Sequence, residues 1–311
     1  MDIYEQIASN KAYTWMAIMY FVLLFVIMGL GFDYFFVGAG AGIPVFTLVA
    51  LVISGIWSVA AFSQGDRFVL FSTHARPLDL SDPAQLQWSN TIEEMSIAAG
   101  IPVPKAYIID DLDPNAFATG MSPDRSSIAV TRGLLNLLNR DELQGVASHE
   151  MSHIKNYDIR LMLIIAVLAG AISLVADWAR RGFYSSGRRS RNDNNGSGMV
   201  IFIIWLCTVI LAPLVTQVMA LFVSRKREYL ADASGAELTR NPMALAAALG
   251  KIDSMAEPTR SIHRGTAHLC ICDPQGHPLG KKLGFAADLF ATHPPIQKRI
   301  ELLRQMAYLE K

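Results

Sequence analysis

Charged residues are scarce in this chain. Of its 311 residues, 17% are Asp, Glu, Lys or Arg, whereas 52% are hydrophobic. Soluble domains carry about 25% charged residues, so we expect part of the chain to lie in a lipid bilayer. The 27 basic and 27 acidic residues balance, which leaves no overall positive charge to attract nucleic acid.

Cysteine is also rare, and the sequence shows no internal repeat. Cys207, Cys270 and Cys272 form an odd, sparse set, which argues against a disulfide framework and favours a reducing compartment. Cys270 and Cys272, with His268 and His277 nearby, match a structural zinc site only weakly. We therefore interpret the two cysteines as residues of a strand. Nothing in the sequence pattern sets an oligomeric state.

Long apolar runs are abundant. Residues 14–32 and 43–62 carry no charge, and each run is long enough to cross a bilayer as a helix. A second pair of apolar runs covers residues 159–176 and 199–223, with Pro213 expected to kink the last run. We expect the Arg-, Ser- and Asn-rich segment between them, residues 180–198, to be a loop. The sequence thus predicts two transmembrane helical hairpins.

The apolar runs divide the chain into four segments. Residues 1–66 form the first hairpin and residues 159–223 the second. The remaining residues, 67–158 and 224–311, are expected to be the two halves of one catalytic domain. The same pattern predicts an α+β fold, predominantly α. Its expected elements outside the apolar runs are helices at 89–100, 133–138, 141–153, 224–238, 242–255 and 294–308 and strands at 106–109, 115–120, 127–131 and 267–271.

Basic residues suggest which side of the membrane faces the cytoplasm. Lys11, Arg67 and Arg76 flank the first hairpin, whereas its loop at residues 33–42 has no Lys or Arg. The positive-inside rule therefore places the catalytic segments in the cytoplasm. Five arginines between residues 180 and 191 oppose this orientation. The first hairpin usually sets the orientation, which leaves open a shallow or protein-covered second hairpin.

A pair of histidines carries the clearest chemical signal. His149-Glu150-Met151-Ser152-His153 reads H-E-x-x-H. Residues four apart share one face of a helix, so the two imidazoles can bind one zinc ion. Glu150 can reach a water on that metal and act as general base.

A catalytic zinc ion needs a third protein ligand. Glu228 and Asp232 are four residues apart and follow the last apolar run, which returns them to the same side of the membrane. Glu228 could complete a His-His-Glu set, and Asp232 could accept the ring N–H of His149. A solvated acidic pair would show the same spacing.

Six segments of the chain match one known family: 115–120 (NAFATG), 130–135 (VTRGLL), 149–154 (HEMSHI), 224–232 (SRKREYLAD), 266–269 (TAHL) and 292–295 (THPP). Through them the chain resembles the HtpX-type integral-membrane zinc metalloproteases, relatives of the CAAX prenyl endoproteases. The likeness covers most of the chain, in the family's order and spacing. Ser152 departs from it, because this place is often held by Gly, and the loop at residues 180–191 is unusually basic.

The resemblance implies a zincin-like catalytic domain with one zinc ion per chain. It implies His149, His153 and Glu228 as ligands, Glu150 as the base and Asp232 as the partner of a ligand. His293 becomes a candidate for stabilising the oxyanion or lining the cleft, although it could equally cap the helix that follows. Residues 115–118 (Asn115, Ala116, Phe117 and Ala118) would belong to an edge strand that holds an extended substrate, or to an ordinary sheet strand.

The implied function is cleavage of unfolded or misfolded membrane proteins at the cytoplasmic face of a bacterial inner membrane, as part of protein quality control under stress. Two alternatives remain. Cleavage of prenylated CAAX termini is disfavoured because four apolar runs are few for a large intramembrane chamber. A membrane scaffold with a vestigial metal site is disfavoured because a purely structural site has no use for Glu150 as a base.

Overall fold

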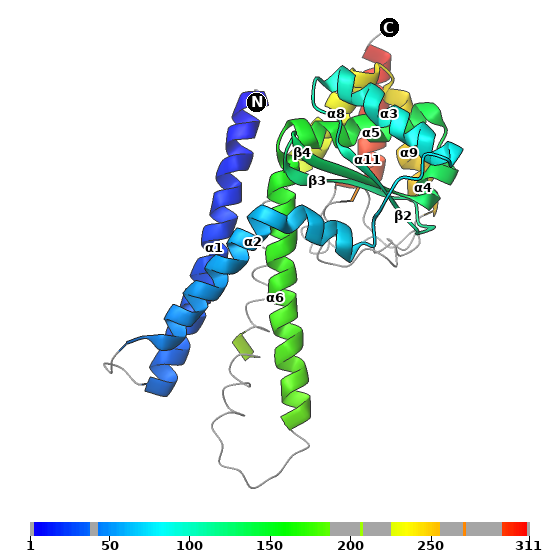
Figure 1. Ribbon diagram of the computed structural model, residues 1–311. Coiled ribbons are helices and arrows are strands. Elements are labelled where there is room, and N and C mark those ends of the chain that lie inside the picture. The colour runs from blue at the N-terminus through cyan, green and yellow to red at the C-terminus, as the bar shows by residue number, and fades with distance from the viewer. Residues whose placement is uncertain are drawn as a thin grey trace.

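Helices dominate the computed structural model, which describes residues 3–37, 43–186, 206–207, 225–255, 270–271 and 294–309. With one small sheet, they confirm the predicted α+β class, predominantly α (Figure 1). The elements are α1 (Ile3–Val37), α2 (Val45–Ser72), β1 (Arg76–Pro77), α3 (Pro83–Ala99), β2 (Lys105–Ile109), β3 (Ala116–Ser122), β4 (Arg125–Thr131), α4 (Arg132–Leu137), α5 (Arg140–Lys155), α6 (Asp158–Ser186), α8 (Arg225–Thr239), α9 (Pro242–Met255) and α11 (Ile296–Leu309).

Two helices among the described residues are long and apolar enough to cross a membrane, within Ile7–Leu30 of α1 and Val45–Ser72 of α2. They pack against each other and against α6, and all three extend away from the sheet and its covering helices (Figure 1). Helix α2 continues beyond the predicted end at residue 62. Its polar stretch near Arg67 is one face of a helix whose other face buries Gly65, Val69 and Leu70.

At the tip of this hairpin, the Asp33 side chain of α1 caps the amino end of α2. Asp33 of α1 accepts hydrogen bonds from the backbone amides of Phe46 and Thr47, at 3.0 and 2.8 Å, and from the Thr47 hydroxyl at 2.6 Å. The first amides of a helix have no partner within it. One carboxylate therefore satisfies the amino end of α2 and ties it to α1.

Helix α6 covers the third apolar run and passes the predicted start of the loop, because it ends only at Ser186. The expectation of a loop from residue 180 is therefore wrong for its first seven residues, where Arg, a good helix former, continues the helix. The rest of that loop lies outside the described residues, as does the fourth run apart from residues 206–207.

The sheet has the strand order β1-β2-β4-β3, with β2 and β4 parallel and the other pairs antiparallel. Strand β3 lies at the edge, as the resemblance implied. Part of that edge is already occupied, because Cys270 pairs with Phe117 and the Ile271 amide donates to the Ala116 carbonyl at 3.0 Å. Of the strand predicted at residues 267–271, these two residues are the described part.

Successive side chains of a strand point to opposite faces of the sheet, and here they pack into two different hydrophobic cores. Ile128 and Val130 of β4 point into a core with Trp88, Met151 and Leu245 of the surrounding helices. Ala129 of the same strand joins a second core with Phe117, Phe21, Val69 and Leu163, the last three from α1, α2 and α6. The sheet therefore lies between two cores, one shared with α3, α5 and α9 and the other with α1, α2 and α6.

Candidate metal centre

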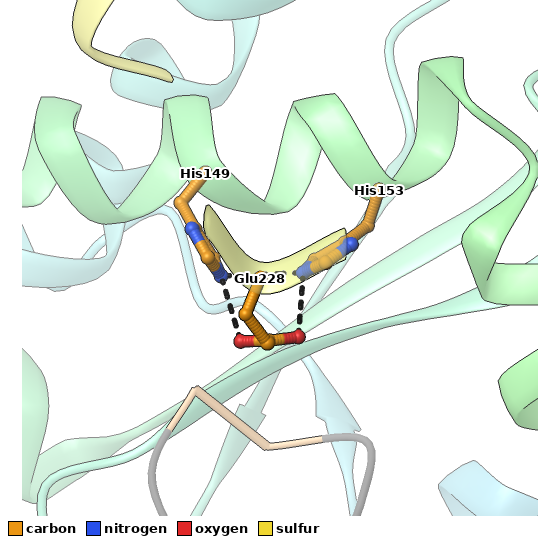
Figure 2. Close-up of side chains that lie close together, drawn as sticks. All are labelled: His149, His153 and Glu228. Atoms are coloured by element: carbon orange, nitrogen blue, oxygen red, sulfur yellow. Dashed lines mark hydrogen bonds and ion pairs between the residues drawn. The ribbon is translucent and has the colours of Figure 1, made fainter. Parts of the chain in front are cut away.

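Helix α5 places both histidines of the H-E-x-x-H segment on one face. A capping box begins the helix, because the Glu142 amide donates to Asn139 Oδ1 at 3.0 Å and the Asn139 amide donates to Glu142 Oε2 at 2.8 Å. Both rings are buried, and their Nε2 atoms lie 3.2 Å apart. The two nitrogens face a common point (Figure 2).

Helix α8 brings Glu228 to the same point. Its Oε1 lies 3.5 Å from His153 Nε2 and its Oε2 lies 3.8 Å from His149 Nε2. Two turns further along α8, a Cβ on Gly235 would stand only 3.0 Å from the His149 backbone nitrogen. The absence of a side chain there allows α8 to approach α5 closely enough for Glu228 to reach both rings.

These three side chains fit a metal ion. Their potential ligand atoms all lie within 4.8 Å of one another. Nitrogens that share a tetrahedral metal at about 2.0–2.1 Å are separated by about 3.4 Å, close to the 3.2 Å found between the Nε2 atoms. Each Nδ1 lies against a carboxylate, which can only accept, so a neutral ring presents its Nε2 lone pair to the common point. Two lone pairs and a carboxylate meeting there favour a cation.

On one side, His149 is held by an ion pair. Its Nδ1 lies 2.9 Å from Asp232 Oδ1, which places Asp232 where the sequence spacing predicted. Arg299, 0% exposed, donates to both Asp232 oxygens at 2.8 and 2.7 Å. Burial acts to raise the pKa of Asp232, but the charge and hydrogen bonds of Arg299 outweigh it and lower the pKa to about 2. Asp232 is therefore ionised and can only accept from His149.

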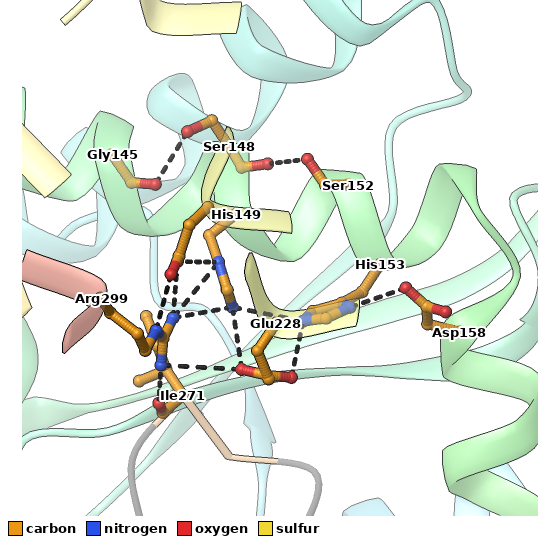
Figure 3. Close-up of polar contacts among 10 residues, drawn as sticks. Gly145, Ser148, His149, Ser152, His153, Asp158, Glu228, Ile271 and Arg299 are labelled. Carbon is orange, nitrogen blue, oxygen red and sulfur yellow. Dashed lines mark hydrogen bonds and ion pairs between the residues drawn. The ribbon is translucent and has the colours of Figure 1, made fainter. Parts of the chain in front are cut away.

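His153 is held by a different acid. Its Nδ1 lies 3.0 Å from Asp158 Oδ2 at the start of α6 (Figure 3). Burial alone would lower the pKa of His153, but the bond to Asp158 and the charges of Glu228, Asp158 and Glu150 raise it to about 9. The site thus favours positive charge strongly, and a metal ion supplies that charge when the proton leaves.

Glu150 is also buried, at 1% exposed. Burial raises the pKa of its carboxyl above the ordinary value, against the lowering effect of His149 and His153. The carboxylate accepts a hydrogen bond from the Ala118 backbone on β3. The candidate base is therefore joined to the edge strand that the sequence predicts to hold substrate.

Ser152, the departure from the family pattern, is accommodated within the helix. Its hydroxyl donates to the Ser148 carbonyl at 3.0 Å, and the Ser148 hydroxyl donates to the Gly145 carbonyl at 2.8 Å (Figure 3). Both hydroxyls are thus hydrogen-bonded within α5, away from the point where the ligand atoms meet.

Comparison with known proteins identifies the family. The sequence model of peptidase family M48 matches residues 83–307. A protein named "Protease HtpX homolog" from Streptococcus gordonii is 39% identical over 98% of this chain and 100% of its own length. Proteins of the same name from Caldanaerobacter subterraneus and Thermoanaerobacter pseudethanolicus are 40% and 41% identical, over 98% of each chain.

The chain belongs to peptidase family M48. The resemblance to HtpX-type metalloproteases is thereby confirmed, and the chain is a metallopeptidase. With the two apolar helices α1 and α2, it is a membrane metallopeptidase.

The structure brings together five residues that the sequence singled out: His149, Glu150, His153, Glu228 and Asp232. The four residues predicted to bind substrate are buried: Asn115 directly precedes β3, and Ala116 to Ala118 begin the strand. His293 lies outside the described residues, as do His268, Cys272 and His277 of the weak second metal pattern. Cys270 is buried beside β3.

Sequence reasoning missed Arg299 and Asp158. Charge balance could have pointed to Arg299, because Glu150, Glu228 and Asp232 together put more negative charge into one buried site than a single metal ion offsets. Asp158 is the first acid after His153, and a metal-binding histidine almost always donates its other ring N–H to a carboxylate, carbonyl or water. A search for that acceptor would have found it.

Proposed function

We propose that this M48 peptidase is a zinc-dependent endopeptidase of the bacterial plasma membrane, with its catalytic part in the cytoplasm and with unfolded or misfolded membrane proteins as substrates. The observation that carries the proposal is the convergence of His149, His153 and Glu228 on one buried point, with Glu150 in the same helix turn.

The donor set favours zinc. Two imidazoles and one carboxylate are a ligand set of catalytic zinc sites, in which a further position stays open for water or substrate. When bound, the zinc ion supplies a water with a pKa of about 7 and polarises the scissile carbonyl. Asp232 and Asp158 hold the Nδ1 protons, so each ring keeps its Nε2 lone pair available.

Glu150 is the proposed general base. Its buried carboxyl, with a raised pKa, is a stronger proton acceptor than an exposed glutamate. It takes the proton of the attacking water and passes it to the leaving amine. Peptide hydrolysis usually needs a further donor at the oxyanion, and we propose His293 for that role because it precedes α11, the helix that carries Arg299.

Strand β3 is the proposed substrate platform. An extended peptide can add to a sheet edge by backbone hydrogen bonds, which tolerate many side-chain sequences and so suit unfolded substrates. Cys270 and Ile271 already pair with Phe117 and Ala116. A substrate strand would therefore pair with β3 from Ala118, where Glu150 contacts the strand, up to Gly120, because the Met121 carbonyl already accepts a hydrogen bond from Arg160 Nε at 2.7 Å.

The test is casein hydrolysis by the full-length protein in detergent. Wild type should bind one zinc ion, cleave unfolded casein and lose activity on chelation. Glu150→Gln keeps the size of the side chain but removes its basicity, so we expect retained zinc and activity reduced to the chelated level. Full activity in this variant, with zinc bound, would exclude Glu150 as the base; an inactive, zinc-free wild type would exclude the enzyme proposal.

A further inference from the structure

The membrane helix α1 reaches the metal centre through one buried amide. Asn10, 2% exposed, donates from Nδ2 to Asp158 Oδ1 at 2.6 Å and to the Asn156 carbonyl at 3.0 Å. Its Oδ1 accepts from Arg227 Nη1 at 3.2 Å. An amide in an apolar membrane helix is costly unless it is hydrogen-bonded, and every polar atom of this side chain is used.

The groups that Asn10 contacts are the neighbours of two metal ligands. The second oxygen of Asp158 holds His153 Nδ1 at 3.0 Å, so Asn10 and His153 share one carboxylate. Arg227, itself buried, directly precedes Glu228 at the start of α8. Asn10 is therefore two contacts away from His153 and bound to the residue next to Glu228.

A second contact fixes α1 to the same corner. Tyr157, between Asn156 and Asp158 at the turn from α5 to α6, adopts a left-handed backbone with φ of 60°. Lys11 Nζ lies 4.5 Å from the centre of its ring, and the Arg160 guanidinium lies 5.0 Å from it. Adjacent residues of α1 thus contact every residue of the turn that carries Asp158.

We infer that Asn10 is a positioning residue of the metal centre, so that the membrane helix α1 completes the site. Asn10 fixes the Asp158 carboxylate in the orientation that presents His153 Nε2. The family model begins only at residue 83, and Asn10 lies outside the region that it matches. The inference rests on the proposed function, because it concerns zinc binding at the proposed site.

The test measures zinc affinity rather than activity. Full-length wild type, Asn10→Ala and Phe21→Ala are compared in one detergent, by competition with a chromogenic chelator and by the absorption spectrum of the cobalt-substituted protein. Phe21 is a buried packing residue of α1 in the core beside the membrane helices, so its truncation loosens the helix without touching the amide network. We expect Asn10→Ala to weaken zinc binding about tenfold and to change the cobalt spectrum, whereas Phe21→Ala changes neither.

A double-mutant cycle with Asp158→Ala tests whether Asn10 acts on His153 through the Asp158 carboxylate. If Asn10 acts through Asp158, Asn10→Ala costs little further zinc affinity once the carboxylate is gone. Asn10→Leu, which keeps a similar side-chain size but removes the donor to Asp158 without adding a charge, gives the same loss should Asn10→Ala fail to fold.

Three results would overturn the inference while leaving the proposed function intact: equal zinc affinity in wild type and both Asn10 variants, an equal loss in Phe21→Ala, or a full additional loss in the Asp158→Ala background. A wild type that binds no zinc would overturn the proposed function and this inference with it.

Discussion

His149 and His153 stand four residues apart on one helix, yet different parts of the molecule hold them. His149 bonds to Asp232 of α8, which is paired with Arg299 of α11 (Figure 3). His153 bonds to Asp158 at the turn into α6, and that acid bonds to Asn10 of α1. One imidazole is supported by helices of the catalytic part alone, the other partly by a membrane helix.

The two histidines belong to one local motif, but a membrane helix helps to hold only one of them. The His149 side resembles a buried ion pair in any globular core, where a guanidinium neutralises a carboxylate. On the His153 side, Asp158 accepts a hydrogen bond from the uncharged amide of Asn10 in α1, and that amide accepts one from Arg227. Glu228 lies between the two sides and faces both rings.

The largest loss of zinc and of activity is expected from changing Glu228, which faces both histidine rings. Glu228→Ala removes a carboxylate that faces both Nε2 atoms, so zinc content should fall to background and casein hydrolysis should cease. Glu237→Ala is the matched control, because Glu237 is an exposed acid on the same helix. Metal analysis after dialysis checks the prediction. Full zinc content in Glu228→Ala would remove it from the ligand set.

A comparison of Asp232→Asn with Asp158→Asn sharpens the contrast between the sides. Each change removes the carboxylate that orients a ligand ring, so zinc affinity should fall about 10- to 100-fold in both. Asp232→Asn also puts a neutral amide opposite the fully buried Arg299, which keeps only a longer contact to a carboxylate among the described residues, 3.6 Å from Nη1 to Glu228 Oε2. Breaking a buried ion pair costs up to about 3–5 kcal/mol. Thermal unfolding of the metal-free proteins should therefore show the larger destabilisation in Asp232→Asn. Equal destabilisation would show that the Asp232–Arg299 pair contributes no more to stability than the Asp158 contacts do.

Gly235→Ala should perturb the His149 side alone, and less severely. The added Cβ would meet the His149 backbone nitrogen at 3.0 Å and the Ser148 hydroxyl at 3.1 Å, so α8 must shift slightly, at a cost of about 1–3 kcal/mol. Gly170→Ala in α6 is the control, because a Cβ there meets nothing within 4 Å. Unfolding in denaturant measures both. A Gly235→Ala protein as stable as wild type would show that α8 does not approach α5 as described.

Much of the site could be predicted because its residues repeat at helical spacing. His149 with His153, and Glu228 with Asp232, are each four residues apart, and that pattern is visible without any knowledge of the fold. Helix α9 was expected at residues 242–255 and is found there. These features depend on local sequence alone.

The supporting residues could not be predicted in the same way. Arg299 is 67 positions from Asp232, and Asn10 is 148 positions from Asp158, so only tertiary packing brings them together. The extension of α2 past residue 62 has a similar cause: the local sequence turns polar there, but burial of Val69 and Leu70 against other helices keeps the segment helical. Tertiary packing, and not the local sequence pattern, therefore determines where α2 ends and which residues support the metal ligands.

The Asp33 cap at the tip of the hairpin also bears on where α1 lies along its own axis. A long helix is free to slide along its neighbour unless something sets its axial position, and the Asp33 carboxylate on the first amides of α2 does so. At 1.5 Å per residue, Asp33 lies about 35 Å along the α1 axis from Asn10. The Asp33 cap near one end of α1 thus sets the axial position at which Asn10, near the other end, meets Asp158 beside the metal centre.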